Sequence, residues 1–305
     1  MHPERTHSTD RTVLDDDALQ RIADEARLHV VSTVAASKAG HVGGPLSAMD
    51  LLTALFFRHM NIDPQRPDWP ERDRFILSKG HSAIGLYTVM ALRGYLPVDE
   101  LATFDKGNSR LQGHPDPTKL PGIETATGSL GQGLAVGVGF ALGARMDGRQ
   151  SRHWVMLGDG ELQEGMIWES AHAAARYELG HLIAIVDQNG LQQYGWPSDG
   201  RGRADRQDPW VGFDVGAIFA SFGWNVLHCD GHDYADIDRV LRGAGERAAV
   251  AAPTVIVART VKGRGLSFAE GQHKWHTGVA TAEQLTLART ELTTATRGRT
   301  DAVDA

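Results

Sequence analysis

The sequence of 305 residues contains a single cysteine, Cys229. One thiol cannot form a disulfide within the chain, so a disulfide-stabilised scaffold is excluded and we expect a reducing, cytoplasmic location. The chain also lacks a hydrophobic run long enough to cross a bilayer, and residues 1–13 do not resemble a signal segment, so we expect no membrane partner. The net charge is −7 and no basic block stands out, which argues against a nucleic-acid surface.

The chain does have a regular alternation of short apolar runs and helix-compatible segments, and no linker-like stretch interrupts it. We therefore predict one large α/β domain in which a parallel sheet is flanked by helices. We expect this domain to span 16–292, with 1–15 a disordered extension and 293–305 a disordered tail. The predicted strands are 75–77, 154–157, 181–186, 224–229 and 253–258, and the predicted helices are 16–36, 46–59, 81–92, 133–146 and 164–177.

Two polar turns follow two of these predicted strands. A Gly-Asp-Gly turn places Asp159 after the run 154–157, and Asn189 and Leu191 follow the run 181–186. Asp159 and Asn189 are about 30 positions apart, the length of one strand–helix–strand unit, so both can reach the same edge of a parallel sheet. A carboxylate, an amide oxygen and the Leu191 carbonyl are hard ligands suited to Mg²⁺. Taken separately, each piece is better explained as an ordinary tight turn, but the pair at this spacing favours the metal site.

The pair of turns resembles the thiamine diphosphate motif, which runs from Gly-Asp-Gly to an Asn about thirty residues later. Further segments are similar to the transketolase family, in family order, from about Ala18 to Leu292. Val42 and Ser129 stand where proline is common in the family. The matching segments are 37–45, 73–81, 113–115, 127–133, 222–224, 230–233 and 260–265.

The resemblance implies a thiamine diphosphate-binding fold, specifically the domain that binds the diphosphate. It implies thiamine diphosphate as cofactor, held with Mg²⁺ or with Ca²⁺ or Mn²⁺ in its place. The implied reaction is transfer of a two-carbon ketol unit from a ketose or ketose phosphate to an aldose. The implied metal ligands are Asp159, Asn189 and Leu191, and the implied cofactor contacts are His81, Gly128, Leu130, Asp159, Gly160, Glu164, Asn189, Lys262 and His276.

Four histidines are the implied catalytic residues. His41, His81 and His114 each lie beside glycines at a predicted loop, where an imidazole can exchange protons with sugar hydroxyls. The fourth is His276, which follows an aromatic residue, although His273 is an alternative.

Two of the implied cofactor contacts have simpler readings. Glu164 resembles an interfacial glutamate of the family, but it could be an ordinary acid in the first turn of a helix. Lys262 could equally be an exposed lysine.

The resemblance covers only one of the three domains that full-length transketolases carry. The pyrimidine-binding domain, with its activating glutamate, has no counterpart here. We therefore expect a split transketolase, in which this N-terminal chain joins a C-terminal subunit carrying that domain and forms a heterotetramer. A specialised ketol- or acyl-transferase of secondary or unusual-sugar metabolism is the second interpretation. A non-catalytic regulatory subunit with the same fold is the third, and the intact glycine and Asp159 motifs argue against it.

Overall fold

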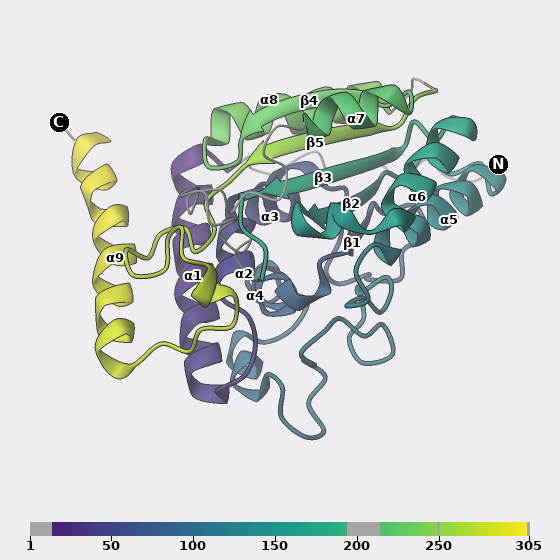
Figure 1. Cartoon of the computed structure of the whole chain (residues 1–305). Helices are drawn as coiled ribbons and strands as arrows, with labels where there is room; N and C mark the ends of the chain where they lie inside the picture. The colour runs from purple at the N-terminus through teal and green to yellow at the C-terminus, as the bar shows by residue number, and fades with distance from the viewer. Residues whose placement is uncertain (1–13, 194–213, 249–250, 304–305) are drawn as a thin grey trace, which may run out of the picture.

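A computed structural model describes residues 14–193, 214–248 and 251–303 of the chain (Figure 1). Its centre is a five-stranded sheet in the order β1-β2-β3-β5-β4. All neighbouring strands are parallel, which confirms the predicted fold class. The strands are β1 Arg74–Leu77, β2 His153–Gly158, β3 Leu182–Gln188, β4 Asn225–Asp230 and β5 Thr254–Arg259.

Both faces of the sheet are buried, because successive side chains of a strand point to opposite sides. In β2, Trp154 and Met156 belong to one hydrophobic cluster, whereas Val155 and Leu157 belong to the other. This arrangement explains why the strands read as continuous apolar runs rather than as alternating ones.

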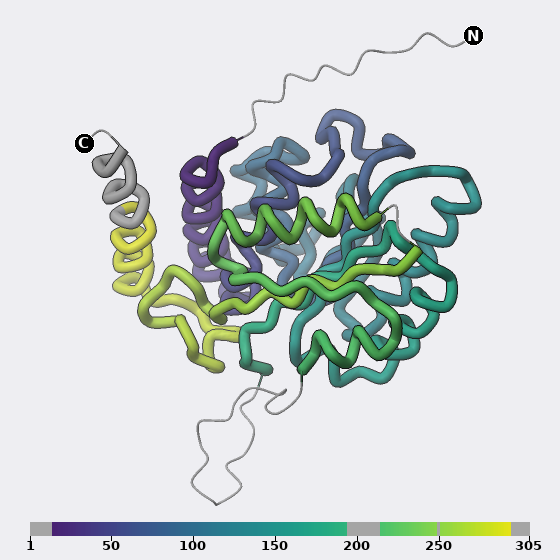
Figure 2. The backbone as a smooth tube through the Cα atoms, turned by 90° about the horizontal axis from the view of Figure 1, so that it is seen from above, coloured from purple at the N-terminus to yellow at the C-terminus, as the bar shows by residue number. Residues whose placement is uncertain are grey.

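Helices cover the two faces. The first cluster contains residues of α1 (Asp16–Ser37), α2 (Gly43–Ser47), α3 (Met49–Ala54), α4 (Ala83–Arg93) and α8 (Tyr234–Arg247). The second contains residues of α5 (Gln132–Met146), α6 (Gly165–Arg176) and α7 (Val215–Ser221). The last helix, α9 (Ala282–Val303), lies beside α1 at one end of the molecule (Figure 2). Short helical turns are η1 Leu55–His59, η2 Gly80–Ser82, η3 Val98–Thr103, η4 Gly160–Gln163 and η5 His273–His276.

The strand order places β5 between β3 and β4. After β3 the chain therefore skips the neighbouring position to form β4 at the edge of the sheet, and it then returns to form β5 in the position that it skipped. The crossover from β3 to β4 contains α7 on one face, and the crossover from β4 back to β5 contains α8 on the other. Right-handed crossovers require this change of face when the direction along the sheet reverses. Because every strand is parallel, all five carboxyl ends meet at one edge of the sheet, where ligands of such folds bind.

The predicted strands and helices are present, with three differences. The helix expected over 46–59 starts at Gly43, is interrupted at Ala48 and ends in the π turn η1. Helices α7, α8 and α9 were not predicted. Among the described residues, no helix is long and apolar enough to cross a membrane.

The third difference concerns the tail. Helix α9 continues to Val303, past the boundary predicted at Leu292. Its threonine hydroxyls bond to carbonyls one turn back, for example Thr290 to Thr286 at 3.1 Å and Thr293 to Arg289 at 2.6 Å. These bonds accommodate threonines in a helix whose apolar side, formed by Leu285, Ala288 and Leu292, packs against the first cluster. The predicted disorder of residues 1–13 concerns residues outside the described part of the chain.

Helix α5 packs closely against β2, and two of its glycines provide a matched test. A Cβ at Gly137 would lie 2.6 Å from Val155 Cγ2, whereas no atom lies within 4 Å of one at Gly139. We expect Gly137→Ala to lower the free energy of unfolding by about 1–3 kcal/mol through overpacking. Gly139→Ala should instead raise it by up to about 1 kcal/mol, because alanine favours the helix. Urea unfolding of both variants tests this, and equal effects would contradict the predicted packing.

Candidate active site

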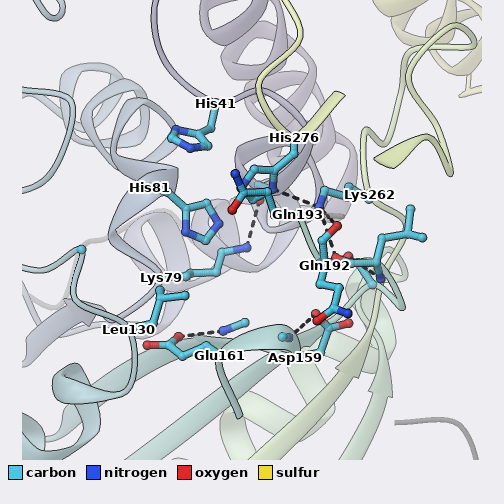
Figure 3. Close-up of a pocket in the computed structure, with 16 residues that line it drawn as sticks. His41, Lys79, His81, Leu130, Asp159, Glu161, Gln192, Gln193, Lys262 and His276 are labelled. Atoms are coloured by element: carbon cyan, nitrogen blue, oxygen red, sulfur yellow. Dashed lines mark hydrogen bonds between the residues drawn. The ribbon is translucent and has the colours of Figure 1, made fainter. Parts of the chain in front are cut away.

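A cavity of about 570 Å³ opens at the carboxyl edge of the sheet (Figure 3). The ends of β2 and β3 form one side of it, and loops from distant parts of the chain form the rest. Four glycines expose backbone in its wall, at positions 44, 128, 158 and 160. The other lining residues are His41, Lys79, His81, Leu130, Asp159, Glu161, Asn189, Leu191, Gln192, Gln193, Lys262 and His276.

Asp159 joins the two polar turns that the sequence singled out. Its side chain is buried, Oδ1 accepts the Gly160 N–H at 2.8 Å, and Oδ2 accepts the Gly190 N–H at 2.6 Å. Burial, together with the nearby Asp187 carboxylate, raises the pKa of Asp159 to about 7. A cation bound beside Asp159 would stabilise its charged form.

Asn189 and Leu191 lie in the same wall as Asp159. Asn189 Oδ1 accepts the Leu191 N–H at 3.1 Å, which holds the turn closed. Within the described residues there is no cluster of three His, Cys, Asp or Glu side chains that could hold a metal ion. The oxygens of Asp159, Asn189 and Leu191 are a different kind of donor set, one that suits Mg²⁺ and leaves coordination positions for phosphate oxygens. These residues therefore fit the implied metal and diphosphate.

An ion pair beneath the cavity was not predicted from the sequence. Lys79, which is 1% exposed, pairs with Asp187 and donates to the Gly44 carbonyl at 3.0 Å. Asp187 also accepts the hydroxyls of Ser47, at 2.6 Å, and Thr260. Burial would raise the pKa of Asp187, but Lys79 and the two hydroxyls together lower it. The charge of Asp187 is therefore balanced by partners inside the protein.

Glu161 is a second buried group that the sequence analysis missed. Its Oε1 accepts the Ser78 hydroxyl at 2.5 Å and the Gly131 N–H at 2.9 Å, and its Oε2 accepts the Gly158 N–H at 3.0 Å. Burial raises the pKa of Glu161. The side chain thus connects the end of β1, the glycine loop before α5 and the Gly-Asp-Gly turn.

Three histidines lie together on the side of the cavity away from Asp159 and Glu161 (Figure 3). The ring centroids of His41 and His81 are 5.2 Å apart, those of His41 and His276 are 5.0 Å apart, and those of His81 and His276 are 4.9 Å apart. Burial lowers the pKa of His41 to about 4 and that of His276 to about 3, and it lowers the pKa of His81 well below its usual value. All three imidazoles are therefore neutral at pH 7, each with one N–H donor and one acceptor nitrogen.

Lys262 is buried at 2% exposure, so the exposed-lysine alternative is wrong. Its Nζ donates to the carbonyls of Leu191 at 3.1 Å and Gln192 at 3.3 Å. It also lies 3.1 Å from His276 Nδ1 (Figure 3). Burial lowers the pKa of Lys262 to about 8. An ammonium can only donate, so His276 Nδ1 is the acceptor and the ring proton is on Nε2.

Three candidate residues lie outside the cavity wall. His114 is exposed, with its ring 6.4 Å from that of His41 and packed against Gly128. Glu164 is exposed before α6, where its Cβ approaches Gly131. His273 is also exposed, so the structure places His276 rather than His273 at the cavity. All the other predicted site residues line it.

Comparison with known proteins matches residues 18–298 to the family described as transketolase, thiamine diphosphate binding domain. The chain is 39% identical over 268 residues to one subunit of the apulose-4-phosphate transketolase of Phocaeicola vulgatus, covering 88% of this chain and 91% of that one. It is 39% identical over 274 residues to 6-deoxy-6-sulfo-D-fructose transketolase subunit SqwG of a Clostridium species, covering 90% and 96%. The transketolase structure of Campylobacter jejuni superposes with a TM-score of 0.82 at 32% identity, covering 92% of this chain but 43% of that one.

Proposed function

This chain belongs to the transketolase family, and from that premise we propose that it is the thiamine diphosphate-binding subunit of a two-chain transketolase. With Mg²⁺ and a partner chain, it transfers a two-carbon ketol unit from a ketose to an aldose in the cytoplasm. The observation that supports this most strongly is the cavity itself. It brings the oxygens of Asp159, Asn189 and Leu191 together with three neutral histidines at the carboxyl edge of the sheet.

The diphosphate end of the cofactor would be held by the metal and by the backbone of the cavity wall. Asp159, Asn189 and the Leu191 carbonyl would bind Mg²⁺, and Gly128, Leu130 and Gly160 would line the cofactor. Thiamine diphosphate supplies the carbanion stabilisation on which cleavage of a carbon–carbon bond depends. The protein supplies orientation, charge and proton transfer.

The histidines provide the proton transfer. His276 receives a hydrogen bond from Lys262 at Nδ1 and therefore presents an N–H at Nε2. His41 and His81 are neutral neighbours whose rings can each donate one hydrogen bond to a sugar oxygen and accept one from a sugar hydroxyl, and a ring that takes up a hydroxyl proton becomes an imidazolium until it passes that proton on. We assign His114 a role at the mouth of the site, since it stands beside His41 but outside the wall.

The donor sugar is a separate part of the proposal. The two subunit relatives are named for apulose-4-phosphate and for 6-deoxy-6-sulfo-D-fructose, sugars that carry a phosphate or a sulfo group. We propose a ketose with an anionic group as donor. The alternative is a specialised ketol or acyl transfer on an unusual sugar. It is favoured by the names of the same two relatives, because apulose-4-phosphate and 6-deoxy-6-sulfo-D-fructose are unusual sugars.

The partner chain is proposed from the fraction of each relative's length that this chain covers. The chain spans 43% of the Campylobacter transketolase, yet 91% and 96% of the two relatives named as subunits. We propose a C-terminal subunit with the pyrimidine-binding domain and a heterotetramer with two copies of each chain.

The test combines mass measurement and calorimetry on this chain mixed with a candidate partner chain that carries the pyrimidine-binding domain. We expect a complex with two copies of each chain, and thiamine diphosphate binding that disappears when Mg²⁺ is chelated. A panel of ketose phosphates and sulfonates then identifies the donor. Cofactor binding that is indifferent to Mg²⁺ would contradict the assignment of Asp159, Asn189 and Leu191.

A further inference from the structure

The segment 230–233, which begins at the last residue of β4, is one of those that resemble the family, but none of its residues lines the cavity. His232 in this segment lies between a buried carboxylate and a backbone amide. Its Nδ1 is 2.7 Å from Asp50 Oδ2, and its Nε2 accepts the Val261 N–H at 2.8 Å. The His232 side chain is 8% exposed and that of Asp50 is 2% exposed.

These two contacts determine the tautomer of His232. A peptide N–H can only donate, so Nε2 must be unprotonated. Nδ1 then carries the ring proton and donates it to Asp50. If the ring carried a proton on Nε2, alone or in addition to the one on Nδ1, the ring N–H and the Val261 N–H would be two donors facing each other.

Asp50 is itself held from two other elements. Arg27 of α1 donates to Oδ2 at 2.6 Å, and the Tyr234 hydroxyl donates to Oδ1 at 3.3 Å. Arg27 is 1% exposed, so its guanidinium is fixed inside the core. The Asp50 carboxylate is therefore a rigid anchor for the imidazole.

On its other side, His232 holds the segment that presents Lys262 to the cavity. Val261 directly precedes Lys262, whose Nζ reaches Leu191, Gln192 and His276. The close approach of the two segments requires glycine at position 231. A Cβ there would lie 2.5 Å from Thr260 Cγ2, and the Gly231 N–H donates to the Arg259 carbonyl at 2.7 Å.

We propose that His232 is a positioning residue for the active site: held by Asp50 as the Nδ1–H tautomer, it fixes the segment 260–263 so that the Lys262 ammonium reaches the cavity wall. The role in catalysis depends on the function proposed above, whereas the positioning of Lys262 does not. A histidine that merely filled the core would affect global stability without controlling this segment.

Two measurements on the full chain test the proposal without cofactor or substrate. The first is ¹⁵N NMR of the histidine-labelled protein, which distinguishes the two neutral tautomers. We expect His232 to be protonated at Nδ1. Protonation at Nε2, or at both nitrogens at neutral pH, would overturn the proposal, and this result does not depend on any variant folding.

The second measurement compares variants by hydrogen exchange and by acylation of Lys262. His232→Leu removes the acceptor, so exchange at Val261 should accelerate about tenfold, the effect of losing one hydrogen bond. Acylation of Lys262 should accelerate as well. His232→Gln retains an acceptor near the position of Nε2 and should restore most of the protection.

The matched control is His153→Leu, which replaces another buried histidine, at the start of β2 and therefore at the opposite edge of the sheet. We expect it to leave exchange at Val261 and acylation of Lys262 unchanged. Equal acceleration in His232→Leu and His153→Leu, or no acceleration in either, would overturn the positioning role. Because neither readout involves ligand, these outcomes are distinct from a failure of the proposed enzyme function.

Discussion

Asp159→Asn is expected to lower the affinity of the assembled enzyme for thiamine diphosphate and Mg²⁺ by at least about 100-fold, since even outer-shell partners of a metal typically contribute 10–100-fold. Asp159 supplies the only full negative charge among the proposed ligands. Two other carboxylates lie nearby: Asp187 is paired with Lys79 and accepts two hydroxyls, and Glu161 accepts the Ser78 hydroxyl and two backbone N–H groups. Calorimetric titration of the complex with thiamine diphosphate, at fixed Mg²⁺, measures the change directly.

Asp73→Asn is the matched control. Asp73 is also 2% exposed, and its oxygens also accept two backbone N–H groups, from Arg152 at 2.9 Å and Asn61 at 3.0 Å. It precedes β1, at the edge of the sheet opposite the cavity. We expect Asp73→Asn to reduce stability while the cofactor affinity stays near that of wild type. Equal losses of affinity in the two variants would indicate a general effect of removing a buried carboxylate and would refute the role of Asp159 as a ligand.

The second large effect is expected at the histidines. His41→Ala and His114→Ala should each slow ketol transfer by about 10²–10⁴-fold, the usual contribution of a positioned proton-transfer group. Cofactor affinity should change only a few-fold, because the proposed partners of these imidazoles are substrate oxygens. Steady-state kinetics on the identified donor, together with calorimetry, separates the two effects.

His273→Ala serves as the control for the histidines, because His273 is exposed and lies outside the cavity although it is close in sequence to His276. Its activity should stay within about twofold of wild type, the range expected when a surface side chain is removed without a catalytic contact. If His41→Ala retains nearly full activity, the histidine cluster has no catalytic role. If ketol transfer slows in His41→Ala but not in His114→Ala, the catalytic role belongs to the cavity wall and His114 has none.

The sequence predicts which candidate residues lie near one another where local patterns dictate the geometry. Asp159 and Asn189 follow apolar runs, and the ends of parallel strands converge at one edge, so their proximity could be inferred from spacing alone. For His41 and His81, the position beside glycines indicated only that an imidazole could reach a ligand, and their place at the site was implied by the family resemblance. The choice between His273 and His276 could not be made this way, because both occupy the short turn η5 and only the fold determines which one faces the cavity.

The buried polar groups were missed because their partners are distant in sequence. Asp187 bonds Ser47 across 140 positions and Thr260 across 73. Lys79 follows the predicted strand 75–77, and a lysine just after a strand is ordinarily expected to be solvated. Glu161 lies within the most conspicuous motif of the chain, yet its contact with Gly131 depends on how the glycine loop folds back. Long-range pairing of this kind has no periodic pattern in the sequence.

The position of β5 between β3 and β4 could not be predicted from the sequence either. The apolar runs predict strands and their parallel direction, but the order depends on which faces α7 and α8 cover. That order brings Thr260, Val261 and Lys262 from the end of β5 next to the polar turn of β3. The site is therefore completed by topology rather than by any single motif.

The most direct test of the two-chain account is an assay of ketol transfer by the purified chain, with thiamine diphosphate, Mg²⁺, a ketose phosphate or sulfonate donor and an aldose acceptor. In the account proposed above, the cavity holds the diphosphate end of the cofactor, and the pyrimidine-activating glutamate implied by the family resemblance would come from the partner. We predict no turnover by the chain alone, and ketol transfer when the partner chain is added. Sustained turnover without a second polypeptide would contradict the account.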